Sequence, residues 1–259
     1  MCAQKEISLD PLSARSLYLT LVSKGEDIGS ATGFVIQWND QSYLITNWHV
    51  ISGHHPETNE TVFENAAIPD EVLIMHHGQK LGTWVDRIEE LVDAQGNAIW
   101  FEYKTKGHIV DVAALPLRAI DDRVKLYPLD LSLSDTDMIP EVAMPISIIG
   151  FPLGLAAAGA FPIWKTGHIA SDPGLDYKGQ PRFLIDATTR SGMSGSPVVL
   201  RLLGGYRTKS GKSIMVQSGC STRFLGVYSG RIHIESEIGM VWRTEVITDL
   251  LNHAVGKVD

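Results

Sequence analysis

Short runs of apolar residues, separated by turn-forming residues, extend through almost the whole chain. In the first half the runs lie at residues 17–22, 33–36, 43–46, 71–75, 82–87, 98–103 and 109–115. In the second half they lie at residues 146–150, 163–170, 182–186, 197–203, 224–228 and 238–242. Asn39 and Asp40 form a turn between two of the runs, which predicts a hairpin. Many short strands with turn signals between them predict an all-β protein built from antiparallel barrels or sandwiches.

The end of the chain has helical periodicity instead. The segment 245–254 carries its apolar residues on one helical face, and Thr244 precedes it as a candidate N-cap. This pattern predicts a C-terminal α-helix. Between the two sets of strands, residues 121–141 are rich in Asp, Ser and Pro, which is typical of a surface linker. We therefore expect two domains, residues 12–130 and residues 131–259, with the helix at the end of the second.

Composition and charge narrow the functional class. The chain has 259 residues, 44% of them hydrophobic and 20% charged, which is ordinary for a globular protein. Its formal net charge of −8 argues against a general nucleic-acid binder, because such proteins usually carry a basic face. No apolar run approaches the length of a membrane span, so none is expected.

The cysteines and the N-terminus bear on localisation. The two cysteines are Cys2 and Cys220, and the position of Cys2 at the extreme N-terminus does not favour a disulfide between them. So few cysteines are typical of a reducing compartment. The first residues lack the apolar core of a signal peptide, so we expect a cytoplasmic protein. The alternative is a lipoprotein beginning at Cys2, or an exported protein whose signal has been removed.

Three residues far apart in the sequence could form a hydrolytic triad. Ser194 lies between glycines in a Gly- and Ser-rich loop, His49 follows a predicted strand, and Asp111 begins an apolar one. A serine hydroxyl becomes a good nucleophile when an imidazole removes its proton, and a carboxylate holds that imidazole in the required tautomer. A packed histidine, a structural aspartate or a flexible loop would each explain one of these residues alone. Their order, His then Asp then Ser, favours the triad.

The loop around Ser194 has a second use in such chemistry. Gly192 allows the backbone to turn, so that the amides of Gly192 and Ser194 could stabilise a tetrahedral oxyanion. The run after Pro197 is β-branched rather than helical. That excludes the nucleophile elbow of α/β-hydrolases, in which the serine precedes a helix.

Taken together, these motifs resemble those of the chymotrypsin-like (trypsin-like) serine proteases, most closely bacterial HtrA-like protease domains without a PDZ domain. They occur in the family's order over residues 17–251, and their joint order and spacing are more specific than any one motif. The matching segments are ATGFVI (31–36), YLITNWHV (43–50), DVA (111–113), IGFPLG (149–154), LIDA (184–187), GMSGSP (192–197) and LGVYSG (225–230).

The resemblance implies two six-stranded antiparallel β-barrels with the active site in the cleft between them. It makes His49 the general base and acid, Asp111 its orienter and Ser194 the nucleophile of a serine endopeptidase that forms an acyl-enzyme. The amides of Gly192 and Ser194 would form the oxyanion hole. Such an enzyme takes a polypeptide substrate and needs no cofactor or metal.

The resemblance also implies a set of substrate-binding residues. The strand segment that would pair with an extended substrate backbone is Ser229, Gly230 and Arg231. The residues at or near the pocket for the side chain before the scissile bond are Thr188, Thr189, Ser229 and Gly239. None of these pocket residues is charged, which favours a small or apolar substrate side chain. Glu235 and Glu237 lie in the neighbouring loop and could reverse that preference.

Three departures from the family pattern concern activity. Met193 replaces the aspartate that digestive members place before the nucleophile, no internal activation sequence is visible near the start, and no PDZ-like domain follows. The oxyanion loop must then be ordered in another way, for which a regulatory protein partner is one candidate. The alternative function is a catalytically silent or partner-activated protease-like binding module. An esterase is a third possibility, although the Ser229-Gly230 edge motif favours a peptide.

Two pairs of adjacent histidines raise the question of a metal site. They are His54-His55 and His76-His77. Neighbours on a strand point to opposite faces, and no cysteine or carboxylate spacing resembles a structural zinc site. We therefore expect solvated loop histidines and no metal.

Overall fold

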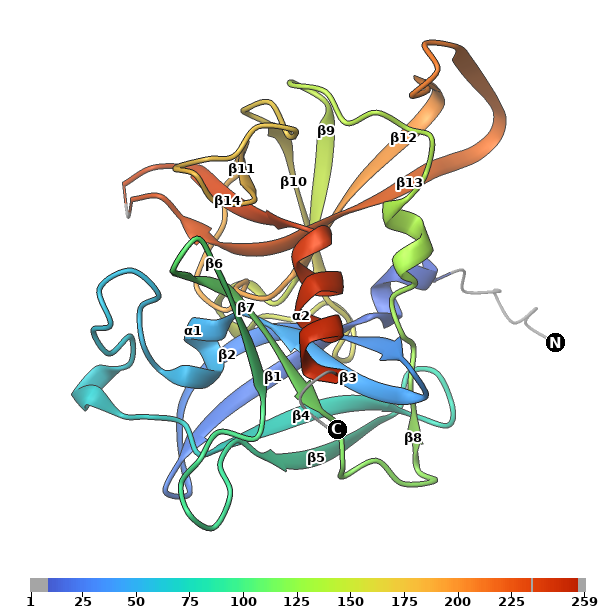
Figure 1. Ribbon diagram of the computed structural model, residues 1–259. Coiled ribbons are helices and arrows are strands. Elements are labelled where there is room, and N and C mark those ends of the chain that lie inside the picture. Colours follow the sequence, from blue (N-terminus) through green and yellow to red (C-terminus); the bar gives the residue numbers. More distant parts are fainter. Residues whose placement is uncertain (1–8, 234, 256–259) are drawn as a thin grey trace, which may run out of the picture.

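Strands from the two halves of the chain form two separate sheets (Figure 1). The computed structural model describes residues 9–233 and 235–255. Its all-β architecture with one C-terminal helix confirms the fold class expected from the apolar runs. Cys2 lies outside the described residues.

The first sheet is antiparallel and contains eight strands, in the order β5-β4-β1-β2-β3-β7-β6 with β8 paired to β4. Its strands are β1 (Ser16–Ser23), β2 (Glu26–Trp38), β3 (Gln41–Thr46), β4 (Glu71–Gly78), β5 (Trp84–Glu90), β6 (Phe101–Thr105), β7 (His108–Pro116) and β8 (Val124–Lys125). The β2–β3 turn contains Asn39 and Asp40, as expected, and both adopt positive φ. The strand number differs from the six expected, and the hydrogen-bonded path does not close. Between β5 and β6 the chain forms its own turn, in which the Asp93 carboxylate accepts the amides of Gln95 and Asn97.

The second sheet is a closed six-stranded barrel in the order β10-β11-β14-β13-β12-β9. Its strands are β9 (Pro145–Gly150), β10 (Ile163–Ile169), β11 (Arg182–Asp186), β12 (Pro197–Arg207), β13 (Ser213–Arg231) and β14 (Ile238–Arg243). Strands β12 and β13 continue beyond the barrel as a projecting hairpin (Figure 1). The sequence predicted only the barrel part of each, because the polar, glycine-containing segment between them lacks an alternating pattern.

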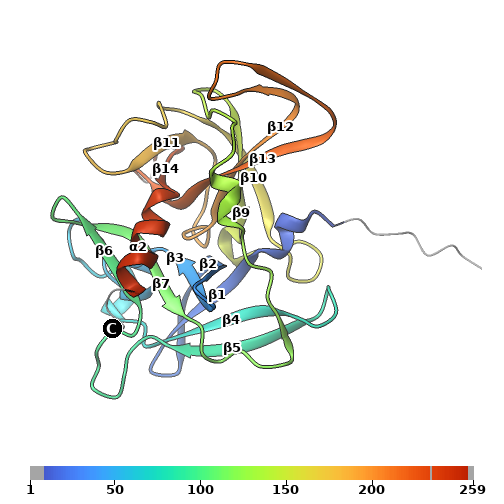
Figure 2. The ribbon, with the colours of Figure 1, turned by 45° about the vertical axis from the view of Figure 1, so that its right-hand side comes forward.

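The helix α2 (Glu245–Val255) occupies the position where both sheets meet (Figure 2). It packs on β6 and β7 of the first sheet and on β14 of the barrel. The other helix, α1 (Trp48–Ser52), is a short turn directly after β3. The 3₁₀ turns are η1 (Pro11–Ala14), η2 (Glu64–Ala66), η3 (Leu131–Ser134) and η4 (Pro152–Gly154). No helix in the described part of the chain is long and apolar enough to cross a membrane.

Buried side chains form three clusters. One lies within the first sheet and one within the barrel. The third combines Phe34 and Val112 of the first sheet with Phe224 and Trp242 of the barrel and Leu250 of α2. Apolar contact therefore joins the two halves, and the boundary at residues 130 and 131 stays a prediction.

The histidines of β4 differ from the sequence expectation. His76 and His77 are 1% and 3% exposed rather than solvated. His77 packs against the rings of Trp84, Tyr127 and Phe161. Burial lowers the pKa of His76 to about 4, with a smaller effect of the nearby Arg87 charge, and it also lowers the pKa of His77. His54 and His55 lie in the loop after α1, as expected for loop residues.

Candidate active site

His49 and Asp111 come together where α1 follows β3 alongside β7. The Nδ1 atom of His49 lies 2.8 Å from Oδ2 and 3.0 Å from Oδ1 of Asp111. The backbone N–H of His49 donates to the same carboxylate at 2.9 Å. Because the carboxylate accepts from Nδ1, the neutral ring keeps its proton there and leaves Nε2 able to accept a proton.

Two further residues hold Asp111, which is only 2% exposed. The hydroxyl of Ser229 donates to Oδ2, and Nδ2 of Asn47 donates to the Asp111 carbonyl at 2.7 Å. A buried carboxylate is costly unless its oxygens are hydrogen-bonded, and the bonds from His49 and Ser229 meet that requirement. Sequence reasoning did not assign Asn47, and it assigned Ser229 only to the substrate. The contact with Asp111 spans 118 positions, so no local signal could reveal it.

The loop that carries Ser194 is tied to both sheets. The Ser194 carbonyl accepts the Thr32 amide of β2 at 2.9 Å, and the Gly195 amide donates to the Tyr228 carbonyl of β13 at 3.0 Å. A Cβ on Gly195 would clash with the Thr32 carbonyl, so glycine permits this close approach. Because Tyr228 precedes Ser229, the same strand contacts the serine loop and Asp111. Among the described residues no hydrogen bond joins the Ser194 hydroxyl to His49.

The carbonyls of the serine loop are held in a way that orients its amides. The Ser191 carbonyl accepts the Leu153 amide at 2.6 Å, and the Met193 carbonyl accepts the Ser196 amide at 3.0 Å. In a trans peptide the N–H points opposite to the preceding carbonyl. The amides of Gly192 and Ser194 therefore point away from these bonds, and neither donates to an acceptor in the described part of the chain. Two free, oriented amides are what an oxyanion hole requires.

Thr32 and Gly192 complete this arrangement. The Thr32 hydroxyl donates to the Gly192 carbonyl at 2.8 Å and accepts the Phe151 amide at 3.2 Å. Gly192 has a φ of +88°, and a Cβ there would clash with the Phe151 carbonyl. Leu153, whose amide holds Ser191, also adopts a positive φ of +56°. A non-glycine residue in that region stores strain of about 1–2 kcal/mol, which the loop contacts offset.

Met193 anchors the loop through apolar packing. Its side chain is fully buried in the barrel core with Ile185, Val198 and Tyr228. Met193, which replaces the aspartate of the digestive proteases, therefore occupies an apolar core position. A charged aspartate would be costly to bury at this position, even with a charged partner. Loop order in this structure rests on apolar burial and on the Thr32 and Leu153 hydrogen bonds.

The predicted substrate-pairing segment has one free edge. The β12–β13 ladder ends at Pro197 and Val227, and the Tyr228 amide donates to the Ser196 carbonyl at 2.9 Å. On its other side β13 continues to pair with β14, with Arg231 opposite Gly239. Within the described residues, the edge of Ser229, Gly230 and Arg231 that faces away from β14 has no strand partner.

Two of the predicted pocket residues, Thr189 and Gly239, lie against the side chain of Tyr228. Thr189 and Gly239 are buried and Thr188 is exposed. The Tyr228 hydroxyl is hydrogen-bonded to Oγ1 of Thr189, and a Cβ on Gly239 would come within 2.7 Å of the tyrosine ring. Burial raises the pKa of Tyr228 to about 12, so its hydroxyl stays neutral. Sequence reasoning missed Tyr228, since it lies among apolar strand residues.

The two acidic residues of the neighbouring loop lie at the surface. Glu235 is exposed, and Glu237 is 3.6 Å from Arg190, both half-exposed. Neither contacts Tyr228 or Thr189 through a hydrogen bond in the described part of the chain. The Glu237 charge is near enough to Tyr228 to contribute to its raised pKa, and the effect of these carboxylates on the pocket preference stays a prediction.

Comparison with solved structures shows the same fold. A serine endoprotease from Yersinia pestis is 15% identical with a TM-score of 0.52, over 96% of this chain and 67% of that chain. The active form of the Rv3671c protease from M. tuberculosis is 17% identical with a TM-score of 0.50, over 93% of this chain and 80% of that chain. A comparison with curated proteins gives no match.

A family model settles the classification. The model for the trypsin-like peptidase domain matches residues 31–202, which is more than half of the chain and includes His49, Asp111 and Ser194. The protein therefore belongs to the trypsin-like peptidase domain family.

Proposed function

We propose that this protein is a serine endopeptidase with His49, Asp111 and Ser194 as its triad. The observation that carries the proposal is the hydrogen-bonded His49–Asp111 pair, joined through β13 to a serine loop whose Gly192 and Ser194 amides are free. Catalytic hydrogen bonds to a serine are often long before substrate binds and tighten in the complex. In this proposal the hydrogen bond from the Ser194 hydroxyl to His49 forms when substrate binds.

The reaction follows from the positions of these groups. Nε2 of His49 removes the Ser194 proton as Oγ forms a bond to the scissile carbonyl carbon, and the amides of Gly192 and Ser194 bind the oxyanion. The imidazolium, stabilised by Asp111, then gives its proton to the leaving amine as the C–N bond breaks. In the second half of the reaction, His49 removes a proton from water, and the water oxygen attacks the acyl carbon. The ester bond to Oγ then breaks, the carboxylic acid product leaves, and the imidazolium returns its proton to Ser194.

Labelling with a fluorophosphonate probe tests this proposal, because the probe reacts only with an activated serine. Wild-type protein should be labelled, and Ser194→Ala should not. Since triad members act as a unit, His49→Ala should lose about as much reactivity as Ser194→Ala. Ser210→Ala, in the projecting hairpin, is the matched control and should label like wild type. Labelling of Ser194→Ala would show that another serine is the nucleophile, and no labelling of wild type would reject the triad and favour a binding module.

We further propose that the enzyme cleaves after small side chains. The ring of Tyr228 fills the space between Thr189 and Gly239 that a large substrate side chain would occupy. A polypeptide library should be cleaved after Gly, Ala or Ser at least about tenfold faster than after Leu or Phe, because each excluded methylene costs about 1–3 kcal/mol.

Replacement of the tyrosine tests the pocket directly. Tyr228→Ala and the milder Tyr228→Val should raise cleavage after Leu and Phe relative to Ala, while Tyr206→Ala in the hairpin should keep the wild-type profile. A wild-type preference for Phe, Lys or Gln would contradict the proposal. An unchanged profile in both active Tyr228 variants would contradict it as well.

A further inference from the structure

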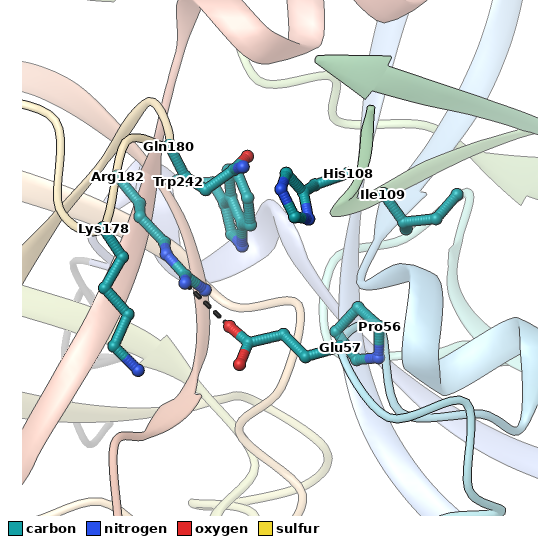
Figure 3. A pocket seen from close by; sticks show the side chains of 8 residues that line it. All are labelled: Pro56, Glu57, His108, Ile109, Lys178, Gln180, Arg182 and Trp242. Atoms are coloured by element: carbon teal, nitrogen blue, oxygen red, sulfur yellow. Dashed lines mark hydrogen bonds and ion pairs between the residues drawn. The ribbon is translucent and has the colours of Figure 1, made fainter. Parts of the chain in front are cut away.

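A cavity of about 250 Å³ lies between the first sheet and the barrel (Figure 3). Its walls come from four segments distant in sequence: the loop after α1, the start of β7, the connection before β11, and β14. The lining residues used below are Glu57, His108, Ile109, Lys178, Arg182 and Trp242. Ile109 precedes Asp111 by two residues on β7, a distance of about 7 Å along a strand. One wall of the cavity therefore lies two residues along β7 from the carboxylate that is hydrogen-bonded to His49.

The cavity collects positive charge in an acidic protein. Arg182 and Lys178 line it, against the single carboxylate of Glu57. The whole chain carries a formal charge of −8. A cationic site on such a background is not explained by general composition, and it favours an anionic occupant.

Arg182 is held by its neighbours, and most of its N–H groups donate no hydrogen bond within the described residues. Its side chain is 6% exposed, and the guanidinium lies 5.2 Å from the Trp242 ring and 5.7 Å from the Tyr177 ring. Its one side-chain hydrogen bond within the described residues is from Nη2 to Glu57, at 2.8 Å. The buried Nε has no acceptor, and neither has Nε1 of Trp242. A guanidinium has five N–H donors, and leaving them unpaired when buried is costly.

Glu57 is the movable member of the ion pair. Its side chain is 51% exposed and extends from a loop, whereas Arg182 is buried between two aromatic rings at the start of β11. The hydrogen bond from Arg182 lowers the pKa of Glu57, with smaller contributions from the charges of Lys178 and His55. The Glu57 carboxylate can turn into solvent when another carboxylate takes its place, because leaving the buried guanidinium unpaired would be costly. A second carboxylate could then share or replace it at Arg182.

We propose that this cavity binds an acidic side chain, Asp or Glu, of the polypeptide substrate. The carboxylate would bind Arg182, and the methylenes would contact Pro56 and the ring of His108, which line the side of the cavity opposite Arg182 (Figure 3). The inference rests on the proposed endopeptidase function, because it places a substrate chain across the cleft. The enzyme would then recognise two substrate side chains: a small one in the pocket at Tyr228 and an acidic one at Arg182, away from the scissile bond.

Binding to the Ser194→Ala protein tests this inference without requiring turnover. The probes are fluorescent octapeptides of Ala, Gly and Ser that carry one Glu at successive positions, each with a Gln counterpart. At one position Glu should bind about tenfold tighter than Gln, the effect of one charge-assisted hydrogen bond. The difference should shrink at high salt. Equal affinity of the Glu and Gln peptides at every position would overturn the inference.

Three variants in the Ser194→Ala background assign the effect to this cavity. Arg182→Met should abolish the preference for Glu. Glu57→Gln, at an exposed site that should not disturb folding, should enlarge it by removing the competing carboxylate. Arg207→Met replaces an exposed arginine paired with Glu141 in the projecting hairpin and should leave the preference unchanged. A preference that survives in folded Arg182→Met and is unaffected by Glu57→Gln would place the acidic site elsewhere.

The same probes separate this inference from the proposed function. Failure of fluorophosphonate labelling in wild type would reject the triad, whereas equal binding of Glu and Gln peptides would reject the acidic subsite alone. With active wild-type enzyme, the favoured Glu peptide should also have the higher kcat/KM, by a similar factor.

Discussion

At the scale of single residues, Thr32 connects β2 to the serine loop through its backbone and its side chain. Its amide holds the Ser194 carbonyl, and its hydroxyl joins the Gly192 carbonyl to the Phe151 amide. Its own carbonyl accepts the Thr46 hydroxyl at 2.8 Å. The residue touches no reacting atom in the proposed mechanism, so its effect on catalysis is to position the loop amides.

Replacement by valine tests that positioning. Thr32→Val keeps the shape but leaves the Gly192 carbonyl and the Phe151 amide unpaired, at a cost of about 1–3 kcal/mol for each buried group. We expect kcat and the rate of fluorophosphonate labelling to fall about 10- to 100-fold, with little change in KM. Thr32→Ser should restore most of the rate, and the exposed Thr166→Val is the control. An unchanged kcat in folded Thr32→Val would remove the threonine from the catalytic arrangement.

At the scale of elements, strand β4 carries two buried histidines, His76 and His77, within a regularly paired strand. Both ring nitrogens of His76 and Nδ1 of His77 are buried without partners among the described residues. Arg87 on β5 adds a nearby positive charge that disfavours protonation of His76. The strand is therefore compatible with neutral histidines and is destabilised when they become charged.

This burial makes the stability of the protein depend on pH. The pKa of His76 is about 4 when folded and about 6.5 when unfolded, so the unfolded state binds more protons between these values. The stabilisation is complete above pH 6.5 and is lost as pH falls towards 4. From pH 7.5 to pH 5 the free energy of unfolding should fall by about 2 kcal/mol through His76 alone.

Urea unfolding at several pH values provides the measurement. His76→Leu removes the titrating group and should flatten the fall between pH 7 and pH 5. The exposed His55→Leu, in the loop after α1, should leave the curve unchanged. A wild-type stability that is equal at pH 5 and pH 7.5 would contradict this account.

At the scale of the whole molecule, α2 and the shared apolar cluster make one unit of the two sheets. Leu250 is fully buried in the cluster that also contains Val112 of the first sheet and Trp242 of the barrel. A helix that packs on both sheets couples their unfolding, because loss of its contacts exposes both surfaces. The domain boundary, a cytoplasmic location and control by a protein partner stay predictions at this scale.

Truncation of that side chain tests the coupling. Leu250→Ala should lower the free energy of unfolding by about 2–5 kcal/mol, the range for buried leucines. We expect a single transition, followed both by tryptophan fluorescence and by circular dichroism. Asn252→Ala, on the exposed side of the same helix, should change stability little. Two separate transitions would show that the sheets unfold independently.

Much of the fold could be predicted because its signals are local. The apolar runs of β1, β3 and β9 and the turn at Asn39 and Asp40 each lie within a few residues. The motifs around His49, Asp111 and Ser194 likewise contain the residues that the chemistry requires. The projecting hairpin was missed because its strands face solvent and carry no apolar alternation. We expected a closed barrel from the sequence, but β5 and β6 at the two ends of the first sheet do not pair with each other. Whether two such distant strands pair is not encoded in a local pattern of residues.

By itself the sequence determined the all-β class, the C-terminal helix and the three residues proposed to act on substrate, since periodicity and motif spacing belong to the chain. Only the tertiary structure decided how they are supported. Thr32 meets Gly192 across 160 positions, and Ser229 meets Asp111 across 118. The burial of His76, the ring of Tyr228 in the pocket and the carboxylate site at Arg182 depend on the same long-range packing. Such contacts arise from how the two sheets fit together, and no local pattern of residues encodes them.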